Sequence, residues 1–170
     1  MSESNESVSK YVDSIYQGYQ INSLKQYSTN RLINVIANRY ANLCKEENIK
    51  LDIDIRDIDF SFITDSDLTA LLDNLLENAY EASKASSKKE IDFVIDRHNE
   101  KYVLIKVSNF TEAIPKISGN TIVTSKENKI IHGIGTKSIA RIVQRYDGNI
   151  EYKFFKEKHI FRSTVLLKMN

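Results

Sequence analysis

Residues 66–84 read Ser-Asp-Leu-Thr-Ala-Leu-Leu-Asp-Asn-Leu-Leu-Glu-Asn-Ala-Tyr-Glu-Ala-Ser-Lys. Apolar side chains recur at three- and four-residue steps from Leu68 to Ala79, which puts them on one face of a helix. Asp65 or Ser66 is expected to cap its start, with acidic residues in the first turn. The stretch therefore predicts an amphipathic helix with its apolar face against a core.

The polar face of this helix is less ordinary than its apolar face. At about 100° per residue, Asn74, Glu77, Asn78 and Glu81 gather in one narrow sector. Asparagine costs a helix roughly half a kcal/mol or more relative to alanine, so two of them four residues apart need a reason. Their side-chain oxygens can ligate a hard cation such as Mg²⁺. Two interpretations are open: an ordinary solvated face, or the wall of a metal–phosphate site.

The overall composition excludes several classes of protein. The 170 residues suffice for one domain with a sizeable core, and a net charge of +1 gives no bulk attraction to nucleic acid or an anionic membrane. We therefore expect no nucleic-acid partner. The single cysteine, Cys44, excludes an internal disulfide and is expected in the core. No apolar run has membrane-spanning length and the start is not a secretory signal, so we expect a cytoplasmic chain without a membrane segment.

Two parts are expected along the chain, residues 1–24 and residues 25–170. Residues 1–7 are polar and are expected to be disordered. Residues 8–24 carry apolar side chains at helical spacing. Such a helix usually packs on a core, but its position ahead of the domain favours the end of a longer interaction helix.

The remaining elements are predicted from periodicity and turn signals. Helices are expected from a cap at Ser28 or Thr29 to about Glu47, and from Gly133 to about Tyr146. Strands are expected at Leu51–Ile55, at Phe60–Ile63 (a shorter one), and at Ile91–Ile95, Tyr102–Val107, Ile150–Phe155 and Ile160–Leu167. The segment from Asn109 to His132 shows no clear periodicity, and such a loop is usually functional or disordered. This order predicts the α+β class: a two-layer α/β sandwich whose mixed, mostly antiparallel sheet has helices on one face.

A second polar motif stands where the last predicted helix begins: His132-Gly133-Ile134-Gly135-Thr136-Lys137. Paired glycines let the backbone approach a ligand and turn its N–H groups inward, and a helix N-terminus adds positive potential that suits phosphate. The alternative is a loop that needs glycine to enter the helix. The spacing matches neither the Rossmann nor the P-loop pattern. A third polar group, Asn109, ends a predicted strand, where it is either a base-binding group or an ordinary strand-terminal residue.

Two of these motifs carry a family resemblance. Leu72-Asp73-Asn74-Leu75-Leu76-Glu77-Asn78-Ala79 is followed downstream by His132-Gly133-Ile134-Gly135. They resemble the N box and the glycine-rich G2 box of the ATP-binding catalytic domain of sensor histidine kinases, in the superfamily that also holds gyrase, the Hsp90 chaperones and MutL. The resemblance covers roughly residues 28–168. It implies the Bergerat ATP-binding fold, with ATP and Mg²⁺ as cofactors.

The resemblance also implies a role for each matching residue. Asn78 would ligate the Mg²⁺ on the ATP phosphates, and Asn74 would lie beside the phosphates. Asn74 and Glu77 are the candidate catalytic residues. The cofactor-binding set that the resemblance implies is Asn74, Asn78, Asn109, Lys126, His132, Gly133, Ile134, Gly135, Thr136 and Lys137.

One motif departs from the pattern of the family. Its G1 box usually reads Asp-x-Gly-x-Gly, with the Asp on the adenine amino group, whereas this chain has Asn109-Phe110-Thr111-Glu112-Ala113. An asparagine still accepts from an amine through its carbonyl oxygen but lacks the charge, so weaker adenine binding is expected. The missing glycines leave the shape of the pocket edge open. This variant, with Glu-Asn-Ala-Tyr-Glu-Ala-Ser in the N box, is similar to the Agr-type, peptide quorum-sensing kinases of Gram-positive bacteria.

The resemblance also implies partners. Such a kinase phosphorylates a histidine on a dimerisation helix ahead of the ATP domain, but His98, His132 and His159 all follow the N box. We therefore expect residues 8–24 to end a dimerisation helix and the acceptor to lie on a segment absent from this chain. A response regulator would receive the phosphoryl group. The full-length protein is expected to be a membrane-anchored homodimer, and the isolated domain a monomer or weak dimer.

Two alternatives to the histidine kinase interpretation remain open. A serine kinase that inhibits a sigma factor needs no histidine acceptor, but those proteins keep Asp-x-Gly-x-Gly. A non-catalytic regulatory or dimerisation module would explain the degenerate G1 box. The retained N box and paired glycines count against that second alternative.

Overall fold

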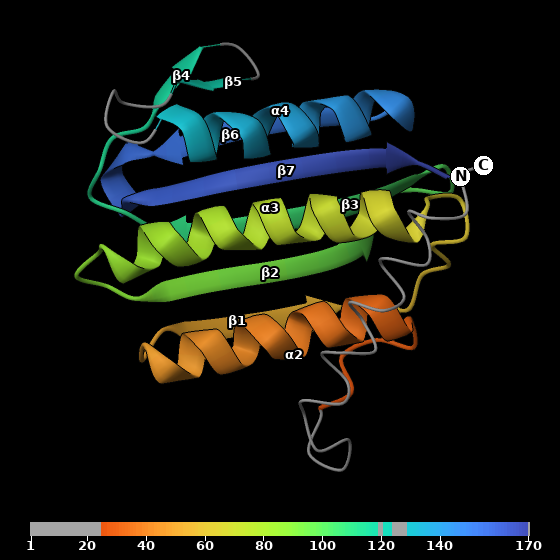
Figure 1. The fold of residues 1–170 in the computed structure, drawn as a ribbon, viewed down its shortest axis with the longest axis horizontal. Helices are drawn as coiled ribbons and strands as arrows, with labels where there is room; N and C mark the ends of the chain where they lie inside the picture. Colours follow the sequence, from red (N-terminus) through yellow and green to blue (C-terminus); the bar gives the residue numbers. More distant parts are fainter. Residues whose placement is uncertain (1–24, 119–120, 124–128, 170) are drawn as a thin grey trace.

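The computed structural model of the chain describes residues 25–118, 121–123 and 129–169. Within these residues, three α-helices cover a five-stranded sheet, and Figure 1 shows the helices side by side. The helices are α2 (Arg31–Glu46), α3 (Asp65–Lys84) and α4 (Lys129–Arg145). The strands of the large sheet are β1 (Lys50–Ile55), β2 (Glu90–Arg97), β3 (Tyr102–Phe110), β6 (Asn149–Phe155) and β7 (Ile160–Lys168), and β4 (Lys116–Ser118) and β5 (Thr121–Val123) pair separately.

The large sheet has the strand order β1-β2-β3-β7-β6. Strand β1 pairs with β2 in parallel, with Ile53 opposite Phe93. The other three pairings are antiparallel, including β3 with β7, where Ile105 lies opposite Val165. The parallel pair requires a crossover, and helix α3 provides it between β1 and β2. The predicted mixed, mostly antiparallel sheet is confirmed.

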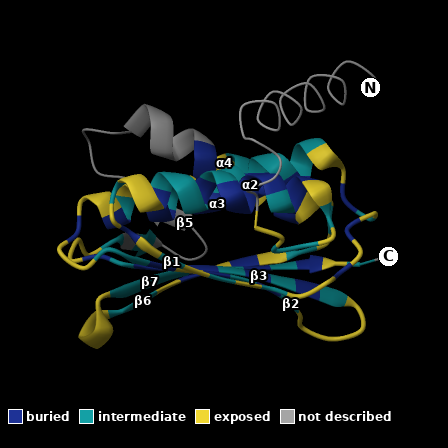
Figure 2. Ribbon diagram, turned by 90° about the horizontal axis from the view of Figure 1, so that it is seen from below, coloured by how far each residue is buried: buried dark blue, intermediate teal, exposed yellow. Residues whose placement is uncertain are grey.

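The buried apolar residues of the described chain form one core between the sheet and the helices. Alternate residues of the strands point into it, as Ile91, Phe93 and Ile95 of β2 do, each at most 2% exposed. Helix α3 contributes the predicted apolar face, including Leu68 and Leu72. Figure 2 shows the described helices on one side of the sheet, and in β2 and β6 the residues between the buried ones are exposed or half-buried. The two-layer α/β sandwich is therefore as predicted.

The starts of α2 and α3 differ from the prediction by one or two residues. Asn30 caps α2, and its side-chain oxygen accepts from the Ile33 N–H at 3.1 Å, while Thr64 caps α3 and accepts from the Asp67 N–H at 3.2 Å. Both caps have extended backbone, which brings the side chain over the first turn. Ser28 is not the cap; its hydroxyl oxygen accepts from the N–H of the capping residue Asn30 at 3.1 Å.

Two other predicted segments were wrong in part. Phe60–Ile63 is no strand but a turn whose buried Phe60 stacks on Phe62, with ring centroids 5.8 Å apart. Its apolar residues face the core from a connection, which local pattern cannot distinguish from a short strand. The segment predicted as a loop from Asn109 to His132 contains the β4–β5 hairpin, and α4 already begins at Lys129.

Two further findings concern the ends and the environment of the chain. The predictions made for residues 1–24 lie outside the described residues. Within the described part, none of the helices combines the length and the apolar character needed to cross a membrane.

Candidate functional site

The contact between α3 and α4 brings two of the predicted motifs together. The Asn74 Nδ2 group donates to the Ala70 carbonyl oxygen at 2.6 Å, which fixes the side chain along its own helix. On the other side, Gly135 of α4 is buried, and a Cβ atom there would lie 2.6 Å from Asn74 Oδ1. The N-box asparagine and the second G2 glycine are therefore in direct contact.

The far end of α4 is tied to the start of α3. Arg145 forms an ion pair with Asp67, with 2.7 Å between Nη1 and Oδ2, and the Tyr146 hydroxyl donates to the same carboxylate at 2.7 Å. The Tyr146 oxygen also accepts from the Thr64 N–H at 3.1 Å. These bonds hold the two helices antiparallel and set the register in which Gly135 meets Asn74.

The position of the Gly-x-Gly motif corrects the sequence prediction. The helix was expected to open at Gly133, but α4 begins at Lys129, so Gly133 and Gly135 lie within the helix. The physical reason is visible at Gly135, where absence of a side chain permits close approach of two helices rather than a turn. The alternative of a glycine needed to enter the helix is wrong for the same reason.

The other predicted cofactor-binding residues near the Gly-x-Gly motif are described to different extents. Thr136 is 8% exposed and Lys137 is exposed on α4. The backbone of His132 and Ile134 is helical, and their side chains are not described. Lys126 lies outside the described residues.

Asn78 and Glu77 lie on α3 one turn beyond Asn74. Asn78 is half-buried, and its side chain makes no hydrogen bond to another described residue. Glu77 is exposed, and its Oε2 atom accepts from the Tyr40 hydroxyl at 3.0 Å. The donor set therefore suits a hard cation at Asn78, because an uncommitted amide oxygen is a ligand that Mg²⁺ accepts.

A charged network joins α2 to the same stretch of α3. Arg39 Nη1 lies 3.1 Å from Asp73 Oδ1, and the Tyr40 hydroxyl lies 3.2 Å from the Asp73 carbonyl oxygen. Burial raises the pKa of Tyr40, and the nearby Asp73 and Glu77 carboxylates raise it further. Burial also raises the pKa of Asp73, and the Arg39 guanidinium opposes that shift. The Tyr40 hydroxyl therefore stays protonated and acts as a donor to Glu77.

Asn109 lies near the end of β3, one residue before its last, as the sequence predicts. The residue is 3% exposed and shares the helix-facing side of the strand with Val107. Its Nδ2 group donates to the Phe110 carbonyl oxygen at 3.1 Å. Figure 1 shows that β3 ends and α4 begins at the same end of the sheet, toward which α3 runs. Asn109 therefore lies at the end of the sheet toward which the Asn78-bearing helix runs, and among the described binding residues the contact is that of Asn74 with Gly135.

A comparison of the sequence with models of protein families identifies the family of this chain. The model of the GHKL domain matches residues 63–167, which is more than half of the chain. The chain is a GHKL domain. The match includes the N-box helix, the variant G1 segment and the Gly-x-Gly helix, and GHKL domains are ATP-binding domains. Among curated proteins, no sequence matches this GHKL domain.

Solved structures show the same fold. The catalytic domain of histidine kinase ThkA is 18% identical with a TM-score of 0.65, over 82% of this chain and 90% of that chain. Acinetobacter baumannii histidine kinase AdeS is 12% identical with a TM-score of 0.60, over 96% of this chain and 76% of that one. The histidine kinase domain of the blue-light activated kinase EL346 from Erythrobacter litoralis is 12% identical with a TM-score of 0.61, over 90% of this chain and 69% of that chain. This GHKL domain therefore has the fold of histidine kinase catalytic domains.

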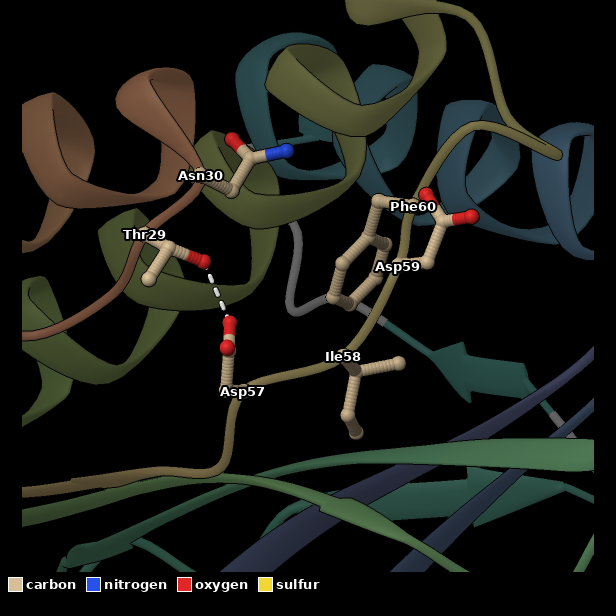
Figure 3. Close-up of a pocket in the computed structure, with 6 residues that line it drawn as sticks. All are labelled: Thr29, Asn30, Asp57, Ile58, Asp59 and Phe60. Carbon is tan, nitrogen blue, oxygen red and sulfur yellow. Dashed lines mark hydrogen bonds between the residues drawn. The ribbon is translucent and has the colours of Figure 1, made fainter.

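The GHKL domain also has a cavity of about 360 Å³ at another place (Figure 3). It lies where the start of α2 faces the segment after β1, and Figure 3 shows the Thr29 hydroxyl pointing at Asp57, to which it donates. The described residues that line it are Thr29, Asn30, Asp57, Ile58, Asp59 and Phe60. None of them is a predicted site residue, and the described chain holds no group of three or more His, Cys, Asp or Glu suited to a metal. This cavity is therefore separate from the candidate site.

Sequence reasoning missed the partner of Glu77. Tyr40 lies 37 positions earlier, within the helix expected to end at about Glu47. Nothing in its local sequence shows that its hydroxyl would reach a carboxylate on another helix. The pairing depends on how α2 packs on α3, which is a tertiary property.

Proposed function

We propose that this GHKL domain is the catalytic domain of a two-component sensor histidine kinase, which transfers the γ-phosphoryl group of Mg-ATP to a histidine on a dimerisation domain. The observation that carries the proposal is the contact between Asn74 and Gly135, with the uncommitted Asn78 amide one turn away. It joins the N-box helix to the Gly-x-Gly helix beside a potential metal ligand. An ordinary solvated face would not need this arrangement.

Each predicted residue has a place in this proposal. Asn78 would hold the Mg²⁺ that accompanies ATP, and Asn74 would lie beside the phosphates. Asn109 accepts from the adenine amino group. The lid residues cover the triphosphate; they are Lys126, His132, Gly133, Ile134, Gly135, Thr136 and Lys137. Bound Mg²⁺ neutralises phosphate charge, and catalysis otherwise rests on positioning.

The candidate catalytic residues are Asn74 and Glu77. Asn74 is held between Ala70 and Gly135, so it is preorganised to meet a phosphoryl group. Glu77 is held by Tyr40 at the exposed side of α3. From there it would face the acceptor histidine rather than the nucleotide.

The partners follow from the same proposal. The acceptor histidine belongs to a dimerisation domain of the same kinase, of which residues 1–24 supply the end of one helix, and residues 25–170 form the catalytic domain. The full-length kinase is a homodimer anchored in the cell membrane, with this domain on the cytoplasmic side as a monomer or weak dimer when isolated. A response regulator accepts the phosphoryl group, and the variant G1 and N boxes favour an Agr-type, quorum-sensing kinase.

Calorimetric titration of the chain with ADP and a non-hydrolysable ATP analogue, with and without Mg²⁺, tests the proposal. Mg²⁺-dependent binding is expected. Addition in trans of a dimerisation helix bearing a histidine should then yield acid-labile phosphate on that helix. Acid-stable phosphate on a serine of a partner would instead favour the serine kinase, and no binding at millimolar nucleotide would favour the non-catalytic module.

A further inference from the structure

The turn after β3 is built without the glycines expected of a G1 box. Among the described residues, the non-glycine residues with positive φ are Asn48, Asp147 and His159, so Thr111 and Ala113 have no left-handed backbone that glycine would relieve. The Thr111 hydroxyl oxygen accepts from the Ala113 N–H at 3.2 Å. The Thr111 N–H donates to the His159 carbonyl oxygen at 2.8 Å. Side chains and a neighbouring connection therefore shape this turn.

A carboxylate joins the same turn to the end of α3. Glu112 accepts from the Ser87 N–H, with 3.2 Å between the nitrogen and Oε1, and also from the Ser87 hydroxyl. These hydrogen bonds from Ser87 lower the pKa of Glu112, so the carboxylate is ionised at neutral pH. Ser87 follows α3 by three residues. The N-box helix is thus connected directly to the variant G1 turn.

The neighbouring serine reaches the carbonyl that Asn109 uses. The Ser86 hydroxyl lies 2.8 Å from the Ala82 carbonyl oxygen and 3.3 Å from that of Phe110. The Phe110 oxygen also accepts from Asn109 Nδ2 at 3.1 Å. Because the amide nitrogen of Asn109 is committed to this oxygen, the amide plane is fixed with its carbonyl oxygen on the opposite side. Any shift of residues 110–112 would release that orientation.

We infer that Ser86, Ser87 and Glu112 form a clasp that positions the Asn109 amide as a hydrogen-bond acceptor, and so sets a preference for a purine with an amino group over one with a carbonyl. This inference rests on the proposed binding of ATP. Adenine offers an amino group to such an acceptor, whereas hypoxanthine offers a carbonyl oxygen that repels it. Where the G1 box of the family has permissive glycines, this turn is held by hydrogen bonds between two connections.

The first test measures base preference by calorimetric titration of the whole chain with Mg-ADP and with Mg-IDP. Glu112→Ala and Ser87→Ala should each weaken ADP binding by about three- to tenfold, the loss of roughly one hydrogen bond, and should leave IDP binding nearly unchanged. The ADP-to-IDP affinity ratio should therefore fall. A general loss of structure would weaken both nucleotides equally.

The matched control is Asp59→Ala. Asp59 accepts from the Ser61 N–H at 2.8 Å and from the Ser61 hydroxyl at 2.9 Å, which is the same kind of pair outside the candidate site. Its loss should leave both affinities unchanged. A fall in the ADP-to-IDP ratio with this variant as well would overturn the inference.

The second test needs no nucleotide. The side-chain amide resonances of Asn109 should exchange with solvent faster in Glu112→Ala and Ser87→Ala than in the wild-type chain or in Asp59→Ala. Unchanged exchange together with an unchanged affinity ratio would overturn the clasp. If the wild-type chain binds neither nucleotide, the proposed function and the base preference both fail, while the exchange rates still decide whether the clasp holds Asn109.

Discussion

Asn74 and Gly135 lie so close that a methyl group on Gly135 would meet the Asn74 side-chain oxygen at 2.6 Å. Asn74 has little freedom to retreat, because its nitrogen donates to the Ala70 carbonyl oxygen at 2.6 Å. The separation of α3 and α4 at the candidate site therefore depends on a glycine at position 135.

Gly135→Ala should weaken Mg-nucleotide binding, because either Asn74 or the α4 backbone must move. Overpacking costs about 1–3 kcal/mol, offset in part by the better helix propensity of alanine. The double variant Asn74→Ala/Gly135→Ala removes the clash and should recover stability without recovering binding. Urea unfolding and calorimetric titration of the three variants measure both effects.

Gly148→Ala is the control for this prediction. A Cβ atom at Gly148 would lie 2.3 Å from the Leu166 carbonyl oxygen, so the substitution should lower stability. Its folded fraction should nevertheless bind nucleotide normally, because the clash lies at the β6–β7 side of the fold. Normal stability and normal affinity in Gly135→Ala would contradict the assigned role of the contact.

Asn78→Ala should abolish Mg²⁺-dependent nucleotide binding while leaving the domain at least as stable. The Asn78 side chain makes no hydrogen bond to another described residue, and alanine is the better helix former by roughly half a kcal/mol. Titration in the presence and absence of Mg²⁺ measures the binding, and thermal unfolding measures the stability.

Asn38→Ala provides the contrast within another helix. The Asn38 amide bonds Lys25 on both sides, donating to its carbonyl oxygen at 2.8 Å and accepting from its N–H at 3.1 Å. Its loss should cost about 1–3 kcal/mol of stability but no affinity. Near-normal Mg-nucleotide affinity in Asn78→Ala would refute the metal assignment.

Local sequence patterns predicted most of the fold. The alternation in Ile91–Ile95 predicted β2 because one face of that strand is buried, and the leucine spacing predicted α3 because its apolar face packs on the sheet. The antiparallel hairpins of the predicted sheet, β2–β3 and β6–β7, follow from the order of the elements. These features depend on neighbours in sequence, so one sequence sufficed.

Contacts between distant residues could not be predicted in the same way. Gly135 was predicted in the first turn of a helix that opens at Gly133, because nothing local shows that α4 starts earlier and packs on Asn74. Ser87 and Glu112 are 25 positions apart and carry no periodic signal. Such pairs are determined by how the helices and strands pack on one another. The position of Asn109 at the end of a strand could therefore be predicted, but its support by Ser87 and Glu112 could not.

Tyr40→Phe should lower stability by about 0.5–1.5 kcal/mol, because the Tyr40 hydroxyl donates to Glu77 at 3.0 Å and the ring itself stays buried. The Tyr40→Phe/Glu77→Gln pair should be non-additive in urea unfolding. The proposed catalytic role of Glu77 leads to a second expectation. Glu77→Gln should lower the rate of phosphoryl transfer in trans and leave nucleotide affinity unchanged. Equal rates of phosphoryl transfer for Glu77→Gln and the wild-type chain would show that Glu77 only stabilises the fold, through its hydrogen bond with Tyr40.

The half-buried Asp73 carboxyl should make stability fall as pH rises. Burial raises its pKa above the ordinary 3.8, so the folded chain binds its proton more tightly than the unfolded chain does, and unfolding free energy drops from about pH 4 upward through the folded pKa. Arg39 limits this effect, since its guanidinium lies 3.1 Å from the carboxylate and lowers that pKa. Asp73→Asn should therefore flatten this part of the pH profile in urea unfolding, and Arg39→Met should steepen it. A profile that Asp73→Asn leaves unchanged would show that other carboxyl groups determine the acid side of the stability curve.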